Sequence, residues 1–352
     1  MNRHEKALLK FAEGTFIPAH PLALTASRKL DEKRQRLLTR YYLNAGVGGL
    51  AVAVHTTQFE IRDPEVGLFE PVLKLAVEEM EAFENKTGKT IVRIAGVCGP
   101  IEQAVEEAKI ALRLGFDAVL LSPGGLNHLT EEDMLKRSSA VAAIIPVLGF
   151  YLQNSVGGRA FTYDYWQKFC EIDNVIGIKS APFNRYQTLD VVRAAALSSR
   201  ADKIALYTGN DDNIVMDLLT KYKFTQDGIT YEKGFVGGLL GHWSVWTHTA
   251  VKLFEQLKEA SKDEYIKADL LTLAMEVTDC NSAFFDTANG FKGCIAGLHY
   301  VLQRQGLLEG IWCLNVEETV SPGQIEEIER VYRLYPHLND DEFVKSNIEN
   351  WI

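Results

Sequence analysis

Lys179 is the residue whose surroundings most clearly suggest chemistry. It ends the run Val175-Ile176-Gly177-Ile178, which is typical of a buried strand because it is rich in β-branched residues and carries no charge. Burial disfavours an ammonium ion and lowers the pKa of a lysine, which leaves a neutral amine able to attack a carbonyl carbon. A lysine that forms a Schiff base needs this property. The alternative interpretation is that Lys179 only reaches past the strand end to solvent or to a carboxylate.

Polar residues also follow other apolar runs of the chain. The second run ends in His55-Thr56-Thr57-Gln58, the fifth ends at Tyr151, and Gly209-Asn210-Asp211-Asp212 follows the seventh. The hydroxyl and backbone N–H groups of a threonine pair suit a small carboxylate, and a phenol can move a proton. Each group also has a structural interpretation. Threonine pairs are common at strand ends, a barrel tyrosine packs in the core, and Asn210 or Asp211 suits the N-cap of a following helix.

The pattern of the whole chain predicts a scaffold that brings these residues together. Segments of helical period, such as 66–85, 101–114 and 131–143, alternate with eight short apolar runs: 16–24, 48–54, 90–97, 118–122, 145–151, 175–179, 203–207 and 235–240. This is the pattern of an α/β fold, the (β/α)8 TIM barrel, whose active sites form at the carboxyl ends of the strands. A doubly wound sheet is less well supported because no GxGxxG motif follows the first strand.

The end of the chain follows a different pattern. Residues from about 245 to 352 look wholly helical, with breaks near 262, 289, 321–322 and 336–337. We expect the last barrel helix and then a C-terminal helical extension. The predicted division is a barrel over residues 1–260 and a helical region packed on it over residues 261–352.

Composition excludes several classes of function. The 352 residues carry a net charge of −10 without a basic cluster, so nucleic acid is not an expected partner. The five cysteines form no CxxC pair, which argues against a zinc site or a disulfide framework and predicts a reducing cytoplasm. The start of the chain is polar and charged, and no apolar run approaches the length of a membrane span. His55 and His242 lack the spacing of metal ligands, so we expect no metal and no cofactor.

Taken together, Thr56-Thr57, Tyr151 and Gly177-Ile178-Lys179 resemble the dihydrodipicolinate synthase / N-acetylneuraminate lyase family of class I, pyruvate-type aldolases. That family has a threonine pair after strand 2, a tyrosine ending strand 5 and the sequence G-I-K at strand 6. The 28 residues from Tyr151 to Lys179 match the family's separation, and Asn210-Asp211-Asp212 looks like its Gly-Asp-Asp. The resemblance covers the barrel, about residues 10 to 260.

The resemblance implies a role for each matching residue. Lys179 would form a Schiff base with the ketone of a 2-oxo acid, and the protonated imine would serve as an electron sink. Tyr151 would be the general acid and base, and Thr56 would hydrogen-bond it and help relay the proton. Thr57 would hold the substrate carboxylate, largely through its backbone N–H. Arg159, Gly209 and Asn210 are candidate contacts to the substrate.

The chain departs from the family pattern at several of these positions. His55 and Gln58-Phe59 replace the residues that flank the family's threonine pair, and Gly124 and Gly125 stand where the synthases carry an aromatic pair. Arg159 lies farther from the tyrosine than the family's arginine does. These departures disfavour the lysine-biosynthetic synthase reaction and leave space for a different, larger or more polar, substrate.

Three functional hypotheses follow. The first is a Schiff-base lyase, an aldolase or dehydratase, acting on a 2-oxo acid such as pyruvate or a 2-keto-3-deoxy sugar acid. The second is a non-catalytic barrel that binds a 2-oxo acid and has lost turnover. The third, a metal-dependent barrel enzyme, is the least supported because the strand ends lack an H-x-H or carboxylate pattern. The resemblance also implies a homo-oligomer, a tetramer or a dimer.

Overall fold

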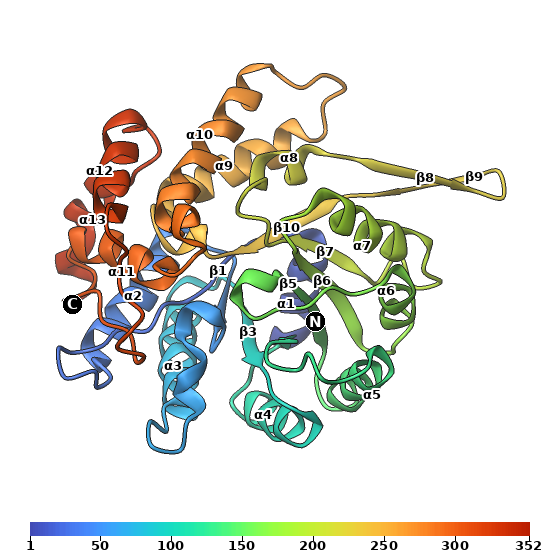
Figure 1. Cartoon of the computed structure of the whole chain (residues 1–352), viewed down its shortest axis with the longest axis horizontal. Coiled ribbons are helices and arrows are strands. Elements are labelled where there is room, and N and C mark those ends of the chain that lie inside the picture. The colour runs from blue at the N-terminus through green and yellow to red at the C-terminus, as the bar shows by residue number, and fades with distance from the viewer.

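Eight parallel strands form the wall of a barrel in the computed structural model, which describes residues 1–352 (Figure 1). The strands are β1 Phe16–Pro18, β2 Gly49–Val52, β3 Val92–Val97, β4 Ala118–Leu121, β5 Val147–Leu152, β6 Val175–Ala181, β7 Ala205–Thr208 and β10 Phe235–Leu240. They pair in parallel in the order β1-β10-β7-β6-β5-β4-β3-β2. A parallel bridge between Ala19, which follows β1, and Ala51 of β2 connects the first and last strands of this order and closes the barrel. There His20 N donates to Ala51 O at 2.8 Å.

Helices surround this wall as the sequence pattern predicts. The helices that follow the strands are α2 Glu32–Ala45, α3 Phe69–Thr87, α4 Ile101–Arg113, α5 Glu131–Ala142, α6 Tyr163–Cys170, α7 Arg185–Leu197, α8 Ile214–Leu219 and α9 Thr247–Ala260. The predicted (β/α)8 TIM barrel is therefore confirmed. All eight predicted strands exist, although β1 is shorter than predicted and β6 continues to Ala181, two residues past Lys179.

Alternate residues of each strand face either the barrel interior or the surrounding helices. One apolar cluster fills the interior and takes side chains from every barrel strand, among them Ile17, Ala51, Ile94, Leu120, Leu148, Phe150, Leu152, Ala181, Tyr207 and Leu239. A larger cluster lies between the wall and the helices and contains Tyr151 together with Trp166 and Phe169 of α6. Adjacent residues of one strand therefore lie in different environments, one inside the barrel and one against the helices.

A helix before the first strand, α1 Arg3–Glu13, covers the amino end of the barrel. Its Lys10 Nζ donates to the carbonyl oxygen of Thr90, just before β3, at 2.8 Å. Its Phe11 ring stacks on Tyr207 inside the barrel, with 4.4 Å between the ring centroids. The amino end of the barrel is therefore closed, and the carboxyl end is the accessible one.

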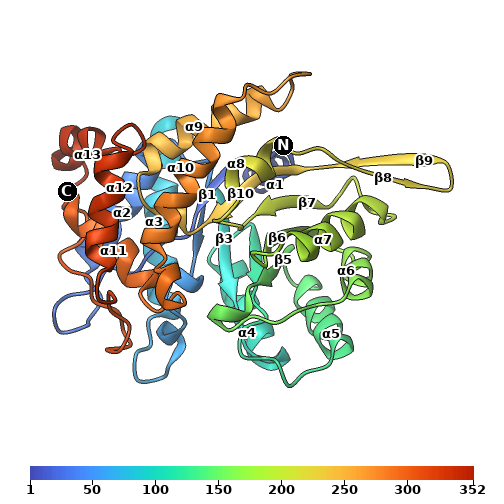
Figure 2. The same ribbon diagram turned by 45° about the horizontal axis from the view of Figure 1, so that its top comes forward.

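Four further helices form the C-terminal extension, α10 Asp269–Phe284, α11 Cys294–Arg304, α12 Gln324–Leu334 and α13 Asp341–Asn347. α11, α12 and α13 lie on the side of the barrel that carries α2, and α10 packs against α8 and α12 (Figures 1 and 2). The expectation of a wholly helical tail is wrong for residues 305–323, which form no regular element. The larger apolar cluster runs without a break from Phe16 to Trp351, so the barrel and the extension share one core.

A hairpin between α8 and β10 was not predicted from the sequence. Its strands, β8 Tyr222–Gln226 and β9 Ile229–Lys233, are antiparallel and joined by the turn Asp227-Gly228. The hairpin projects away from the barrel in both views (Figures 1 and 2). No helix of the structure has the length and the apolar character needed to cross a membrane.

Candidate active site

Lys179 lies inside the barrel near the carboxyl end of β6. The sheet register places it beside Phe150 of β5 and Tyr207 of β7, and both of these side chains belong to the interior cluster. Lys179 is 8% exposed. It lines a small cavity of about 60 Å³, called here the inner pocket, whose other lining includes His55, Thr56, Phe150, Gly209, Asp211 and Cys294.

The Lys179 amine has no carboxylate close enough to form a salt bridge. Its Nζ atom instead lies 4.3 Å from the centre of the Phe150 ring, in a cation–π arrangement. Burial lowers the pKa of Lys179 to about 8, and the negative charge of Asp211 opposes this shift. A larger share of the amine is thus neutral near pH 7 than for a lysine in water.

Gly209 leaves the space that the Lys179 side chain occupies. A Cβ atom built on Gly209 would lie 2.5 Å from Lys179 Cε and 2.8 Å from Ala181 Cβ. Carbon atoms that are not bonded rest about 3.5–4.0 Å apart. Gly209 therefore contributes to the inner pocket through the side chain that it lacks.

Asp211 is the one carboxylate of the inner pocket. It follows β7 and is 8% exposed. Its Oδ1 atom accepts from the backbone N–H of His242 at 3.0 Å, and its carbonyl oxygen accepts from Asn281 Nδ2 of α10 at 2.6 Å. Burial raises the pKa of Asp211 to about 7, against the opposing effects of the His242 N–H and of Lys179. The predicted N-cap role of Asn210 or Asp211 is wrong, because Asn213 is the N-cap of α8.

The two threonines occupy different environments. Thr56 lines the inner pocket, and its buried hydroxyl has no hydrogen-bond partner in the protein. The Thr57 hydroxyl donates to His20 O at 2.6 Å, and its backbone N–H donates to Val54 O at 2.9 Å. Thr57 is completely buried and does not line the pocket, so both groups expected to hold a carboxylate are already bonded within the protein.

Tyr151 lies on the outer face of β5, away from Lys179. Its hydroxyl accepts from the backbone N–H of Phe161 at 3.2 Å, and its ring packs against Phe161 and Trp166. Val147 pairs with Val175 but Leu148 pairs with Gly177, so Ile176 of β6 is an extra residue, as at a β-bulge. Without the extra residue Lys179 would pair with Tyr151, whereas with it Lys179 pairs with Phe150. Phe150 therefore faces the amine, and the structure does not support the expected acid–base role of Tyr151.

Arg159 and Asn210 are also bonded outside the pocket. Arg159 Nη1 donates to Leu126 O and Leu129 O, at 3.2 and 2.6 Å, which ties together two loops. Asn210 is fully buried, and its Oδ1 atom accepts from Phe183 N at 3.1 Å. Phe183 lines the inner pocket with φ of +52°, a left-handed conformation that is unusual for a bulky residue. Asn210 thus positions a pocket wall, and neither residue contacts the cavity itself.

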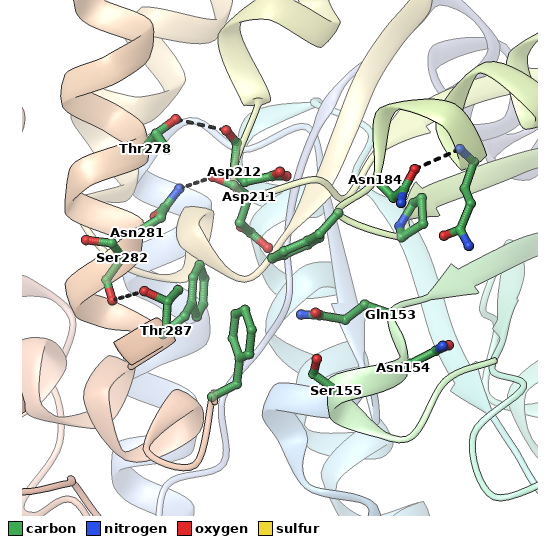
Figure 3. A pocket seen from close by; sticks show the side chains of 15 residues that line it. Gln153, Asn154, Ser155, Asn184, Asp211, Asp212, Thr278, Asn281, Ser282 and Thr287 are labelled. Atoms are coloured by element: carbon green, nitrogen blue, oxygen red, sulfur yellow. Dashed lines mark hydrogen bonds between the residues drawn. The ribbon is translucent and has the colours of Figure 1, made fainter. Parts of the chain in front are cut away.

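A larger cavity of about 580 Å³, called here the outer pocket, shares part of its lining with the inner pocket. Figure 3 shows Asp211 and Asp212 beside α10, with Gln153, Asn154 and Ser155 across the cavity. The residues from α10 are Thr278, Asn281 and Ser282. The outer lining contains amides, hydroxyls and two carboxylates but no lysine or arginine.

Several lining residues could not be assigned from the sequence. Phe150, Phe183 and Cys294 line the inner pocket as apolar or neutral groups without a motif of their own. The residues of α10 that line the outer pocket belong to the C-terminal extension, which the barrel pattern of the sequence does not cover. No group of three or more histidine, cysteine or acidic residues is arranged to hold a metal ion.

A model of the dihydrodipicolinate synthetase family matches residues 15–223, more than half of the chain. The chain belongs to this family. A 4-hydroxy-tetrahydrodipicolinate synthase of Marinobacter nauticus is 25% identical over 283 residues, which cover 78% of this chain and 82% of the relative. The corresponding synthase of Clostridium novyi is 34% identical over 141 residues, which cover 39% of this chain and 46% of the relative. The chain thus matches less than half the length of the Clostridium novyi synthase.

Solved structures share the fold at low sequence identity. Dihydrodipicolinate synthase from Oceanobacillus iheyensis gives a TM-score of 0.73 at 16% identity, covering 95% of this chain and 99% of that one. N-acetylneuraminate lyase from Fusobacterium nucleatum gives 0.70 at 16% identity, covering 92% and 99%. The predicted barrel is therefore confirmed, and so is the predicted family, whose matched relatives are synthases.

Proposed function

We propose that this member of the family forms a Schiff base between Lys179 and the ketone of a 2-oxo acid. The observation that carries this proposal is a buried lysine without a carboxylate partner, inside a cavity at the catalytic end of a TIM barrel. The neutral amine attacks C2, the carbinolamine loses water, and an iminium ion results. Its positive charge draws electrons from C3, so that a bond at C3 can break.

The sizes of the two pockets support a substrate with a small head and a longer tail. The inner pocket, about 60 Å³ in volume, has room for a pyruvyl head bonded to Lys179. The unpartnered Thr56 hydroxyl can donate to the carboxylate of that head. The outer pocket, about 580 Å³, has room for the rest of the molecule. Its amide and hydroxyl lining, without a cation, favours a hydroxylated tail over a second carboxylate, as in a 2-keto-3-deoxy sugar acid.

A cleavage assay tests this substrate class. Purified protein is incubated with a panel of 2-keto-3-deoxy sugar acids, released pyruvate is measured with a coupled reductase, and loss of water from the substrate is followed by NMR. The proposal predicts pyruvate release or dehydration for at least one member of the panel. Lys179→Arg keeps a positive charge but cannot form the imine, so this variant must lose the activity. Substantial turnover by Lys179→Arg would contradict the role given to Lys179.

A non-catalytic 2-oxo-acid-binding barrel is the second candidate. The observation in its favour is that no tyrosine lines the inner pocket: Phe150 faces Lys179 where a tyrosine was expected, and the Tyr207 hydroxyl donates to Phe11 O at the amino end of the barrel. This candidate predicts that 2-oxo acids bind without any bond at C3 breaking. Calorimetric binding together with unchanged substrate after long incubation would support it over the lyase.

We also propose that the chain assembles as a homo-oligomer, a dimer or tetramer, acts in the cytoplasm, and consists of a barrel over residues 1–260 with a helical region over residues 261–352 packed on it. The resemblance to the family supports the assembly, and five buried cysteines without disulfides support a reducing compartment. Light scattering after size exclusion measures the mass directly. A monomer across the micromolar range would contradict the proposed assembly.

A further inference from the structure

The proposed Schiff-base chemistry needs a group that moves protons at the substrate carbons, and this inference rests on that proposed function. The Tyr151 phenol is held outside the barrel by Phe161 N. Besides Lys179, the ionisable side chains lining the inner pocket are His55, Asp211 and Cys294. Burial raises the pKa of the Cys294 thiol well above its ordinary value, so the thiol stays protonated. Burial and the charge of Lys179 lower the pKa of His55 to about 4, which disfavours a protonated imidazole.

Asp211 has the position that the chemistry requires. Five residues line both pockets, and Asp211 is the only ionisable one among them. A substrate bonded to Lys179 through C2 in the inner pocket, with its tail in the outer pocket, places C3 and C4 where the pockets meet. Asp211 follows β7 and lines both pockets, and Figure 3 shows it among the residues that line the outer one.

The surroundings of Asp211 hold it in place without neutralising it. Its main chain is fixed by Asn281 of α10, and Oδ1 accepts one backbone N–H, from His242. No lysine or arginine forms a salt bridge with its carboxylate, although Lys179 lies near enough for their charges to interact. The neighbouring charged or titratable groups are Lys179, His55, His242, Asp212 and Cys294. A buried carboxyl with one fixed donor and one free oxygen can accept and return a proton.

We propose that Asp211 is the general acid and base of this enzyme, in the role that the resemblance assigned to Tyr151. During imine formation, protonated Asp211 gives its proton to the carbinolamine hydroxyl, which leaves C2 as water. In the iminium ion, the Asp211 carboxylate then takes a proton from C3. The C3–H electron pair forms the C2=C3 bond, and the iminium π pair becomes the lone pair of the Lys179 nitrogen.

Aldol cleavage uses the same group at the next carbon. The carboxylate takes the proton of the C4 hydroxyl, C4=O forms, and the electron pair of the broken C3–C4 bond becomes the C2=C3 bond of the enamine. The tail leaves as an aldehyde. Protonated Asp211 then returns the proton to C3, and water releases pyruvate from Lys179.

Two pKa shifts support this assignment. Burial lowers the pKa of Lys179 and raises that of Asp211, so their values approach each other, at about 8 and about 7. A proton can then pass between the two groups at little cost near neutral pH. The free pair has access to the state with a neutral amine and a neutral acid, which imine formation needs.

Exchange of the pyruvate methyl protons in D₂O, followed by NMR, tests Asp211 without knowledge of the full substrate. Asp211→Asn keeps an oxygen that accepts from His242 N and removes the ionisable group. We expect exchange to slow by about 100-fold or more, while prolonged borohydride treatment with pyruvate still labels Lys179. Asp211→Glu should exchange faster than Asp211→Asn because it retains a carboxyl. Asp190→Asn on α7, whose carboxylate is 40% exposed and pairs with Arg193, is the matched control.

The outcomes separate this inference from the proposed function. If Asp211→Asn exchanges the pyruvate protons at the wild-type rate, the role of Asp211 is wrong, but the Schiff base on Lys179 is not contradicted. A pyruvate adduct on wild-type Lys179 without any exchange also overturns the role of Asp211. If the wild type shows no adduct and no exchange, this result contradicts both the proposed function and this inference. If thermal unfolding shows that Asp211→Asn does not fold, Asp211→Ser, which is smaller and also lacks the carboxyl, carries the comparison.

Discussion

Gly209→Ala tests whether the geometry around Lys179 controls imine formation. The added methyl group would lie 2.5 Å from Lys179 Cε, whereas contacts of this kind rest at about 3.5–4.0 Å. The Lys179 side chain must therefore move by about 1 Å. A misplacement of this size costs on the order of 100-fold in rate when the reacting atoms need a defined approach. We expect the rate of borohydride trapping with pyruvate to fall by about that factor.

The fold should tolerate this substitution. Lys179 Cε is near the end of a flexible side chain, but Ala181 Cβ, at 2.8 Å, is rigid, so overpacking should cost about 1–3 kcal/mol. Thermal unfolding measures this loss. Gly124→Ala is the matched control, because its nearest atom is the Ser122 hydroxyl oxygen at 3.3 Å and Gly124 lines neither pocket. If Gly209→Ala folds and traps pyruvate at the wild-type rate, the claim that Gly209 positions Lys179 for imine formation is refuted.

Three further predictions concern Tyr151, Lys179 and Asn210. Tyr151→Phe should leave pyruvate exchange within about twofold of wild type and cost about 1 kcal/mol of stability through the lost bond to Phe161 N; a 100-fold loss of exchange would restore Tyr151 as the proton carrier. The trapping rate at low pyruvate should be highest between about pH 7 and 8 and fall on both sides, because imine formation needs a neutral Lys179, whose pKa is lowered to about 8, and a protonated Asp211, whose pKa is raised to about 7; a rise continuing to pH 10 would indicate an unperturbed amine. Asn210→Ala should raise KM more than it lowers kcat, since it frees the Phe183 wall; steady-state kinetics with unchanged KM would contradict this.

The barrel and the position of Lys179 could be predicted because both depend on local patterns. A buried apolar run ending in a lysine defines a strand and its carboxyl end, whatever its neighbours are. The face of β5 could not be predicted in this way. Phe150 and Tyr151 are adjacent, so one faces inward and the other outward, and the extra residue Ile176 in β6 places Phe150 beside Lys179. Sequence spacing alone cannot reveal such a shift.

The polar residues around the site were harder to assign for a related reason. Arg159 and Asn210 were candidate substrate contacts because of their places after strands, yet their partners are backbone groups of distant segments. The Thr57 hydroxyl likewise bonds His20 O, which is remote in sequence. Asn281 belongs to the helical extension, where no motif marks it. These assignments depend on tertiary contacts, which motif spacing does not encode.

Borohydride trapping with pyruvate, followed by peptide mapping, tests the central claim most directly. The account predicts one pyruvate-derived adduct per chain, located on Lys179 and absent from Lys179→Arg. An adduct on another lysine, or none after exposure to pyruvate and longer 2-oxo acids, would contradict the Schiff-base role of Lys179.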